Sequence, residues 1–262
     1  MAGNEIEVCK FLFSNIGKIY LSHIGHVVEV AAPISSSDRY VPIQCLEDFS
    51  QISTSHSDKK ADIYLNGQGV SIKQMGGSFS FNRLQRKNLF TLYTNLSLSY
   101  PETIITTMDE EVHKFHQGLL LRRNQPWQKF FVEQDFKTLM QFLMLEASPN
   151  LGSSKHPAEF ILEASQPIKH QDDLTLYSFD EYFERYKQKL EISIRRQWIG
   201  QESNSEHSRA LGISRNLDNA PWVFDNVAGV PLPHKITQKI WRDDFPESDR
   251  KTVYFLMIEK KK

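Results

Sequence analysis

ADIYLNGQGVSIKQ, which spans residues 61–74, is the stretch on which the interpretation of the whole chain rests. Residues 61–65 have the apolar and large side chains of a short strand, and residues 69–74 have the composition of its returning partner. Asn66 and Gly67 between them form a strong two-residue turn signal, because such turns require positive φ angles that these residues tolerate. The stretch therefore predicts a tight β-hairpin.

A carboxylate and a lysine fall on the two strands of this hairpin. Asp62 lies on the first strand and Lys73 on the second. Side chains on one face of a sheet recur every second residue, so a short hairpin can bring these two together. A metal ion held by a carboxylate polarises a phosphate and acidifies water, and a nearby lysine can orient that water. The pair suits phosphodiester hydrolysis, but an exposed Asp and Lys on an ordinary hairpin would have the same spacing.

The segment after the hairpin predicts a basic helix over residues 81–96, with apolar residues on one side. Three of its cations recur at i, i+3 and i+4 and would share a helix face. Amide side chains nearby could help them to contact phosphates or base edges, although a solvated helix face is the simpler alternative. The candidate DNA-binding residues are Asn82, Arg83, Gln85, Arg86 and Lys87.

The rest of the chain predicts alternating helices and strands. Hydrophobic spacing and turn residues favour helices at 3–16, 134–147 and 180–198, strands at 27–31, 158–164, 173–179 and 252–259, and irregular structure at 200–220.

Composition is that of an ordinary globular protein, with 262 residues, 40% hydrophobic and 24% charged. The net charge of −1 gives no global positive field. Two cysteines make neither a disulfide scaffold nor a structural zinc site. The chain has no phosphate-loop motif, no signal-peptide pattern and no apolar run of membrane-spanning length. We therefore expect a cytoplasmic protein with no membrane partner.

The segment ADIYLNGQGVSIKQMGGSFSFNRLQRKNL, residues 61–89, is similar to the catalytic segment of type II restriction endonucleases of the PD-(D/E)xK nuclease superfamily. The resemblance implies an α/β fold with a mixed central sheet flanked by helices, and additional α+β elements toward the C-terminus. It implies that Asp62 binds the metal, that Lys73 is the catalytic lysine, and that the backbone carbonyl of Ile72 is a further metal ligand.

Two positions depart from the family pattern. Ala61 stands where many members have proline, and Ser71 stands where the second acid normally lies. Some restriction enzymes with serine at that point look similar, and the opening helix would then supply the acid. We expect Glu7 in this role, with Glu5 as the fallback, unless both are exposed acids favoured by the helix dipole. Gln74, which follows the lysine, is expected to contact a phosphate or the water.

The resemblance implies a Mg²⁺-dependent enzyme that cuts double-stranded DNA at specific sites. A homodimer with one centre per strand and a cognate DNA methyltransferase would accompany that activity. We expect the catalytic core in residues 1–150 and a recognition or accessory region in residues 151–262, unless the two form one domain. The alternatives are a repair or structure-selective nuclease of the same fold, and a DNA-binding protein without catalysis, which Ser71 favours.

Overall fold

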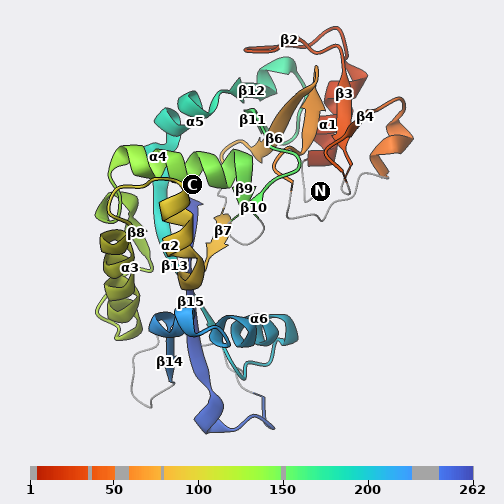
Figure 1. The fold of residues 1–262 in the computed structure, drawn as a ribbon. Coiled ribbons are helices and arrows are strands. Elements are labelled where there is room, and N and C mark those ends of the chain that lie inside the picture. Colours follow the sequence, from red (N-terminus) through yellow and green to blue (C-terminus); the bar gives the residue numbers. More distant parts are fainter. Residues whose placement is uncertain are drawn as a thin grey trace. The chain divides into compact units, whose positions relative to one another are not determined.

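The structure, a computed structural model, describes residues 5–34, 37–50, 59–77, 80–148, 152–225 and 242–261. The chain divides into two compact units that interleave along the sequence (Figure 1). The first unit comprises Met1–Phe79, Met140–Lys189 and Lys261–Lys262, and the second comprises Ser80–Leu139 and Leu190–Lys260. The division expected at residue 150 does not coincide with these units, because each unit builds its sheet from strands on both sides of that residue.

The first unit contains a six-stranded mixed sheet with the order β12-β11-β6-β5-β3-β4. Strand β11 runs parallel to β6, and the other neighbours are antiparallel. The strands are β3 (Val30–Pro33), β4 (Tyr40–Pro42), β5 (Ile63–Leu65), β6 (Gln68–Gln74), β11 (Phe160–Ala164) and β12 (Leu174–Tyr177).

The predicted hairpin is confirmed as β5 and β6. Its turn residues Asn66 and Gly67 have φ angles of 52° and 81°, as the turn chemistry requires. The Asn66 side chain also fixes the turn, because its Oδ1 accepts from the backbone N–H of Val28 at 2.9 Å and its Nδ2 donates to His26 O at 2.8 Å. The turn is therefore attached to the chain that leads into β3.

Helices cover both faces of this sheet. Helix α1 (Glu5–Ser14) packs Val8 and Leu12 into one apolar cluster with Val70 and Ile72 of β6. Helix α5 (Phe179–Tyr186) lies over the opposite face, where the Tyr186 hydroxyl donates to the carboxylate of β11. The first unit is thus a mixed α/β structure with a mixed sheet flanked by helices.

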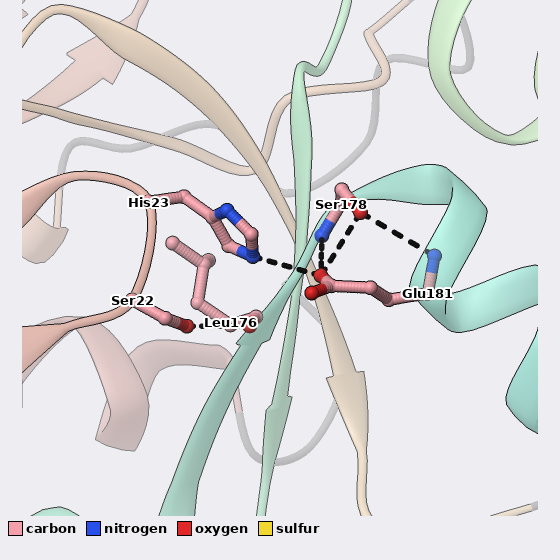
Figure 2. A network of polar contacts seen from close by, with 5 residues as sticks. All are labelled: Ser22, His23, Leu176, Ser178 and Glu181. Atoms are coloured by element: carbon pink, nitrogen blue, oxygen red, sulfur yellow. Dashed lines mark hydrogen bonds and ion pairs between the residues drawn. The ribbon is translucent and has the colours of Figure 1, made fainter.

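Short elements complete the first unit. The hairpin of β1 (Tyr20–Leu21) and β2 (Gly25–His26) is attached to α5 and β12 by two contacts (Figure 2). His23 Nε2 lies 2.7 Å from Glu181 Oε2, and Ser22 Oγ donates to Leu176 O at 2.9 Å. The remaining short elements are η1 (Leu46–Ser50), the π-helical η3 (Phe142–Glu146), β9 (Ala147–Ser148), β10 (Gly152–Ser153), η4 (Gln171–Asp173) and η5 (Lys187–Lys189).

The second unit is built on a sheet with the order β14-β15-β13-β8, in which β7 also pairs with β15. The strands are β7 (Ser80–Leu84), β8 (Asn124–Pro126), β13 (Leu190–Trp198), β14 (Val223–Asp225) and β15 (Lys251–Lys260). The helices are α2 (Arg86–Asn95), α3 (Pro101–His116), η2 (Trp127–Lys129), α4 (Glu133–Gln141), α6 (Asn204–Ser214), η6 (Leu217–Trp222) and η7 (Glu247–Asp249).

Three sequence-based assignments in this part of the chain are wrong. The helix expected over 81–96 begins only at Arg86, because Ser80–Leu84 forms a strand that pairs with β15. The helix expected over 180–198 ends at Tyr186, and Leu190–Trp198 pairs with β15 instead. The irregular segment expected at 200–220 contains α6.

Among the described residues, no helix combines the length and the apolar character needed to cross a bilayer.

Candidate functional site

Asp62 lies immediately before β5 and is bonded to β6 through both its backbone and its side chain. Its backbone N–H donates to Val70 O at 2.9 Å. Its Oδ2 atom accepts from the backbone N–H of Ile72 at 2.6 Å and, over a longer 3.4 Å, from Ser71 Oγ. The carboxylate thus accepts a hydrogen bond that a backbone carbonyl of a neighbouring strand would otherwise accept. This bond to the Ile72 N–H fixes the carboxylate beside β6.

Lys73 reaches the same place from β6. Its Nζ donates to Ser71 Oγ at 2.7 Å and to Ile72 O at 3.0 Å. Ser71 and Lys73 are two residues apart on one strand, so they share a sheet face. A hydroxyl can donate and accept at once, and Ser71 donates to Asp62 while it accepts from Lys73. We call these three residues the Asp62–Ser71–Lys73 cluster.

A buried histidine fixes the chain that leads into the cluster. The backbone N–H groups of Lys60 and Ala61 both donate to His156 O at 2.9 Å. The His156 ring is held in turn, with Nδ1 2.9 Å from Tyr64 Oη and Nε2 2.9 Å from Ile34 O. A carbonyl only accepts, so Nε2 carries the hydrogen and Nδ1 accepts from the tyrosine. These bonds hold the segment before Asp62 in one conformation.

A second lysine lies near the cluster. Lys60 Nζ donates to Leu143 O at 2.6 Å, at the π-helical segment η3. Burial lowers the pKa of Lys60 to about 8, and the positive charge of Lys73 adds to this effect while Asp62 opposes it. The two ammonium groups and the carboxylate therefore lie within electrostatic range of one another.

A buried carboxylate stands beside Lys73 on the neighbouring strand. Glu163 of β11 is the direct partner of Lys73 in the parallel register, and its side chain is buried. Its Oε2 atom accepts from the Tyr186 hydroxyl, which also accepts from Arg185 Nε at 3.3 Å. Partners in register are on the same face, so Glu163 extends the row of polar groups that the cluster begins.

The two acids of α1 differ in their placement. Glu7 is exposed, whereas Glu5 is half-buried and lies one turn before the buried Cys9. Burial raises the pKa of Cys9, and the negative charges of Asp62 and Glu5 raise it further. Glu5 and Asp62 therefore both lie within electrostatic range of Cys9. Glu7, in contrast, is exposed to solvent.

Gln74 lies apart from the cluster. It follows Lys73 on the strand and so points to the other face, where its Nε2 donates to Gln166 Oε1 at 3.1 Å.

The oxygen atoms of the cluster suit Mg²⁺ by their chemistry. Within the described ranges, no group of three or more His, Cys, Asp or Glu side chains could hold a metal ion. Mg²⁺ however needs only one or two carboxylates, because it keeps several waters and takes further oxygens from substrate phosphates. Asp62 Oδ1, which makes no hydrogen bond in the described part of the chain, and Ile72 O would supply the protein donors.

The candidate DNA-binding residues belong to the second unit and do not form one helix face. Arg83 lies in β7, with its guanidinium 5.3 Å from the centroid of the Phe255 ring. Arg86 pairs with Asp109 at 2.9 Å, so its charge is already compensated within the protein. Lys87 is exposed, consistent with either a phosphate contact or a solvated side chain.

Gln85 is the half-buried N-cap residue of α2, without a side-chain cap bond. Asn82 lies in β7, and its side chain is outside the described part of the structure. Residues 228–233, a Gly- and Pro-containing stretch for which the sequence predicts a loop, also lie outside the described residues.

Sequence reasoning missed Lys60, His156 and Glu163. Lys60 has a local signal, since it stands two residues before Asp62 in KKAD. His156 and Glu163 have none, because strand pairing over about ninety residues of sequence places them. Comparison of the chain with protein-family models, with curated proteins and with solved structures gave no match.

Proposed function

We propose that the protein is a type II restriction endonuclease that hydrolyses phosphodiester bonds of double-stranded DNA at specific sites with Mg²⁺. The observation that supports this proposal is the shared contact at Ser71 Oγ, where the Asp62 carboxylate and the Lys73 ammonium converge. On an ordinary exposed hairpin, the two charged side chains would have no reason to meet at one buried hydroxyl.

Each group would have a separate task. Asp62 Oδ1 and the Ile72 carbonyl would hold Mg²⁺, which when bound polarises the phosphate and lowers the pKa of water. The Lys73 ammonium would orient the attacking water and offset the charge that develops on the phosphate oxygens. The water would add to phosphorus and release a proton to solvent, the P–O bond to the leaving sugar oxygen would break, and that oxygen would take up a proton from solvent. Ser71 would keep the carboxylate and the ammonium in register.

The second acid of the proposed centre would come from helix α1. Glu5 is the better candidate from α1, because it shares with Asp62 the surroundings of Cys9, whereas Glu7 is exposed. Gln74 takes no part, since it faces away from the cluster.

The strand arrangement is compatible with a restriction-endonuclease-like fold. The acid precedes β5, the lysine lies on the antiparallel β6, and a parallel strand β11 follows on the far edge of β6. The proposal extends to double-stranded DNA as the partner, a homodimer with one centre per strand, a cognate DNA methyltransferase and a cytoplasmic location.

Digestion of a sequenced plasmid with Mg²⁺, and in parallel with EDTA, tests the proposal. The expected result is a set of discrete fragments with Mg²⁺ and intact plasmid with EDTA. Cleavage only at junctions or flaps would favour a repair nuclease with the same centre. DNA binding that is unchanged by Mg²⁺, together with no cleavage, would favour a DNA-binding protein without catalysis. Ser71, which stands where the family has its second acid, favours this alternative.

A further inference from the structure

The roles proposed above leave Lys60 without a task, although its ammonium lies within electrostatic range of both Asp62 and Lys73. Its one hydrogen bond in the described part of the structure goes to Leu143 O at 2.6 Å. An ammonium group carries three donors, so two N–H groups remain for other acceptors. A ligand bound at the cluster would be one such acceptor.

The balance of charge around the cluster favours an anion. Two ammonium groups, Lys60 and Lys73, lie within electrostatic range of Asp62. The other carboxylate beside Lys73, that of Glu163, is already bonded to the Tyr186 hydroxyl. The two ammonium groups repel each other, and partial burial strengthens this repulsion because water screens the charges less. A phosphodiester group brings a negative charge and acceptor oxygens, and it would offset the repulsion between the lysines.

Lys60 is also held in place before any ligand arrives. Its backbone N–H is bonded to His156 O at 2.9 Å, and its ammonium is bonded to Leu143 O. A donor that is already ordered loses little side-chain entropy when it binds a ligand. A solvated lysine would be mobile and would lose more.

We infer that Lys60 is a substrate-binding residue whose ammonium holds a non-bridging oxygen of the scissile phosphate, beside Lys73 and opposite Asp62. This inference rests on the proposed nuclease function. It assigns the two lysines different tasks: Lys73 acts on the attacking water, and Lys60 fixes the phosphate.

Three variants separate this role from a structural one. Lys60→Gln removes the charge but keeps an N–H donor for Leu143 O, and Lys60→Arg keeps the charge. Lys59→Gln is the matched control, because the neighbouring Lys59 also donates to a backbone carbonyl, Pro33 O, at 3.1 Å. Thermal unfolding of all three shows whether each variant is folded.

The experiment measures binding of linearised plasmid DNA in EDTA over a range of salt concentrations, and the cleavage rate with Mg²⁺. We expect Lys60→Gln to bind DNA with a salt slope smaller by about 0.9, as the loss of one phosphate contact requires. We expect its cleavage rate to fall about 10- to 100-fold, as the loss of a charge-assisted hydrogen bond requires. Lys60→Arg should recover part of both losses, and Lys59→Gln should show neither.

Two other results have different meanings. A wild-type protein that cuts DNA, with Lys60→Gln matching Lys59→Gln in slope and rate, overturns the role of Lys60 and leaves the nuclease proposal intact. A wild-type protein that neither binds nor cuts DNA overturns both proposals.

Discussion

Among single residues, Ser71 has the most consequential placement. Its hydroxyl donates to the Asp62 carboxylate and accepts from the Lys73 ammonium, so one small side chain fixes two charged ones. It is buried, which keeps water from competing for these bonds. In the proposed nuclease centre, serine at this position would align the carboxylate and the ammonium instead of supplying a second negative charge.

Replacement of Ser71 by alanine tests this role. Ser71→Ala removes the shared contact, and we expect DNA cleavage to slow about 10- to 100-fold because the reacting groups lose alignment. The free energy of unfolding should fall by only about 1 kcal/mol, the usual net value of one hydrogen bond. Ser22→Ala, which also removes one hydroxyl bond, to Leu176 O, is the control and should cut normally. Equal cleavage rates for the two variants would show that Ser71 does not align Asp62 and Lys73 for cleavage.

The candidate site is only partly predictable from its residues. Asp62 and Lys73 can be named because a two-residue turn and strand alternation bring them together. Lys60 is indicated only by its place two residues before Asp62, because its polar surroundings give no sign of burial. Glu163 lies beside Lys73 through a strand pairing ninety residues away in sequence. No local pattern encodes that register.

Among the elements, the β5–β6 hairpin was predictable because its turn chemistry is local. The strand Ser80–Leu84 was not, since its partner β15 lies at the end of the chain and its own sequence also suits a helix. Leu190–Trp198 did carry a signal, the alternation of Leu190, Ile192 and Ile194, which the assignment of a long helix overlooked.

Strand β6 depends on a glycine at its closest approach to another segment. A Cβ atom at Gly69 would lie 2.4 Å from Pro157 O and 3.2 Å from the Ala61 side chain. We expect Gly69→Ala to destabilise the protein by about 1–3 kcal/mol, because the backbone must shift.

The matched control is Gly212→Ala in α6, where a Cβ would meet no atom within 4 Å. Alanine is the better helix former, so this variant should be more stable than wild type by about 0.5–1 kcal/mol. Urea unfolding measures both changes. A Gly69→Ala variant as stable as wild type would contradict the packing argument for β6.

Helix α5 begins with a carboxylate whose charge stabilises the fold in a pH-dependent way. Glu181 Oε2 accepts from Ser178 N at 2.8 Å and Ser178 Oγ at 2.9 Å, and it contacts His23 (Figure 2). The Ser178 backbone N–H, then its hydroxyl, lower the pKa of Glu181 below 4.5. The stabilisation is therefore present above pH 4.5 and is lost as the pH falls through the lowered pKa.

Glu181→Gln should accordingly unfold at a lower temperature than wild type at pH 7. This difference should shrink as the pH falls below 4.5, the ordinary pKa of the group. Asp172→Asn, an exposed substitution in the same unit, should show no such trend. Thermal unfolding between about pH 3 and about pH 7, a range that spans the ordinary carboxylate pKa values near ~4, measures both. A difference that is constant over this range would show that the charge of Glu181 does not stabilise α5.

For the whole molecule, the interleaving of the two units is the main finding. Strand β11 follows residue 150 yet pairs with β6, and β13 follows it yet pairs with β8. The expected boundary at residue 150 rested on the resemblance of residues 61–89 to a catalytic segment, which does not report long-range strand pairing.

Fragments 1–150 and 151–262 should therefore not fold on their own. Each would lose sheet neighbours and expose unpaired strand edges and apolar faces. Circular dichroism should show no cooperative thermal transition for either fragment, in contrast to the intact chain. A cooperative transition in the first fragment alone would mean that β3, β5 and β6 are stable without β11.

The central claim, that Asp62 and Lys73 form one catalytic centre, is tested most directly by the single-turnover cleavage rate of Lys73→Met with Mg²⁺. Lys10→Met, which changes an exposed lysine of α1, serves as the control. We predict that Lys73→Met binds plasmid DNA but cuts it about 10²- to 10⁴-fold more slowly than wild type, while the control cuts normally. Cleavage by Lys73→Met at the wild-type rate would contradict the account.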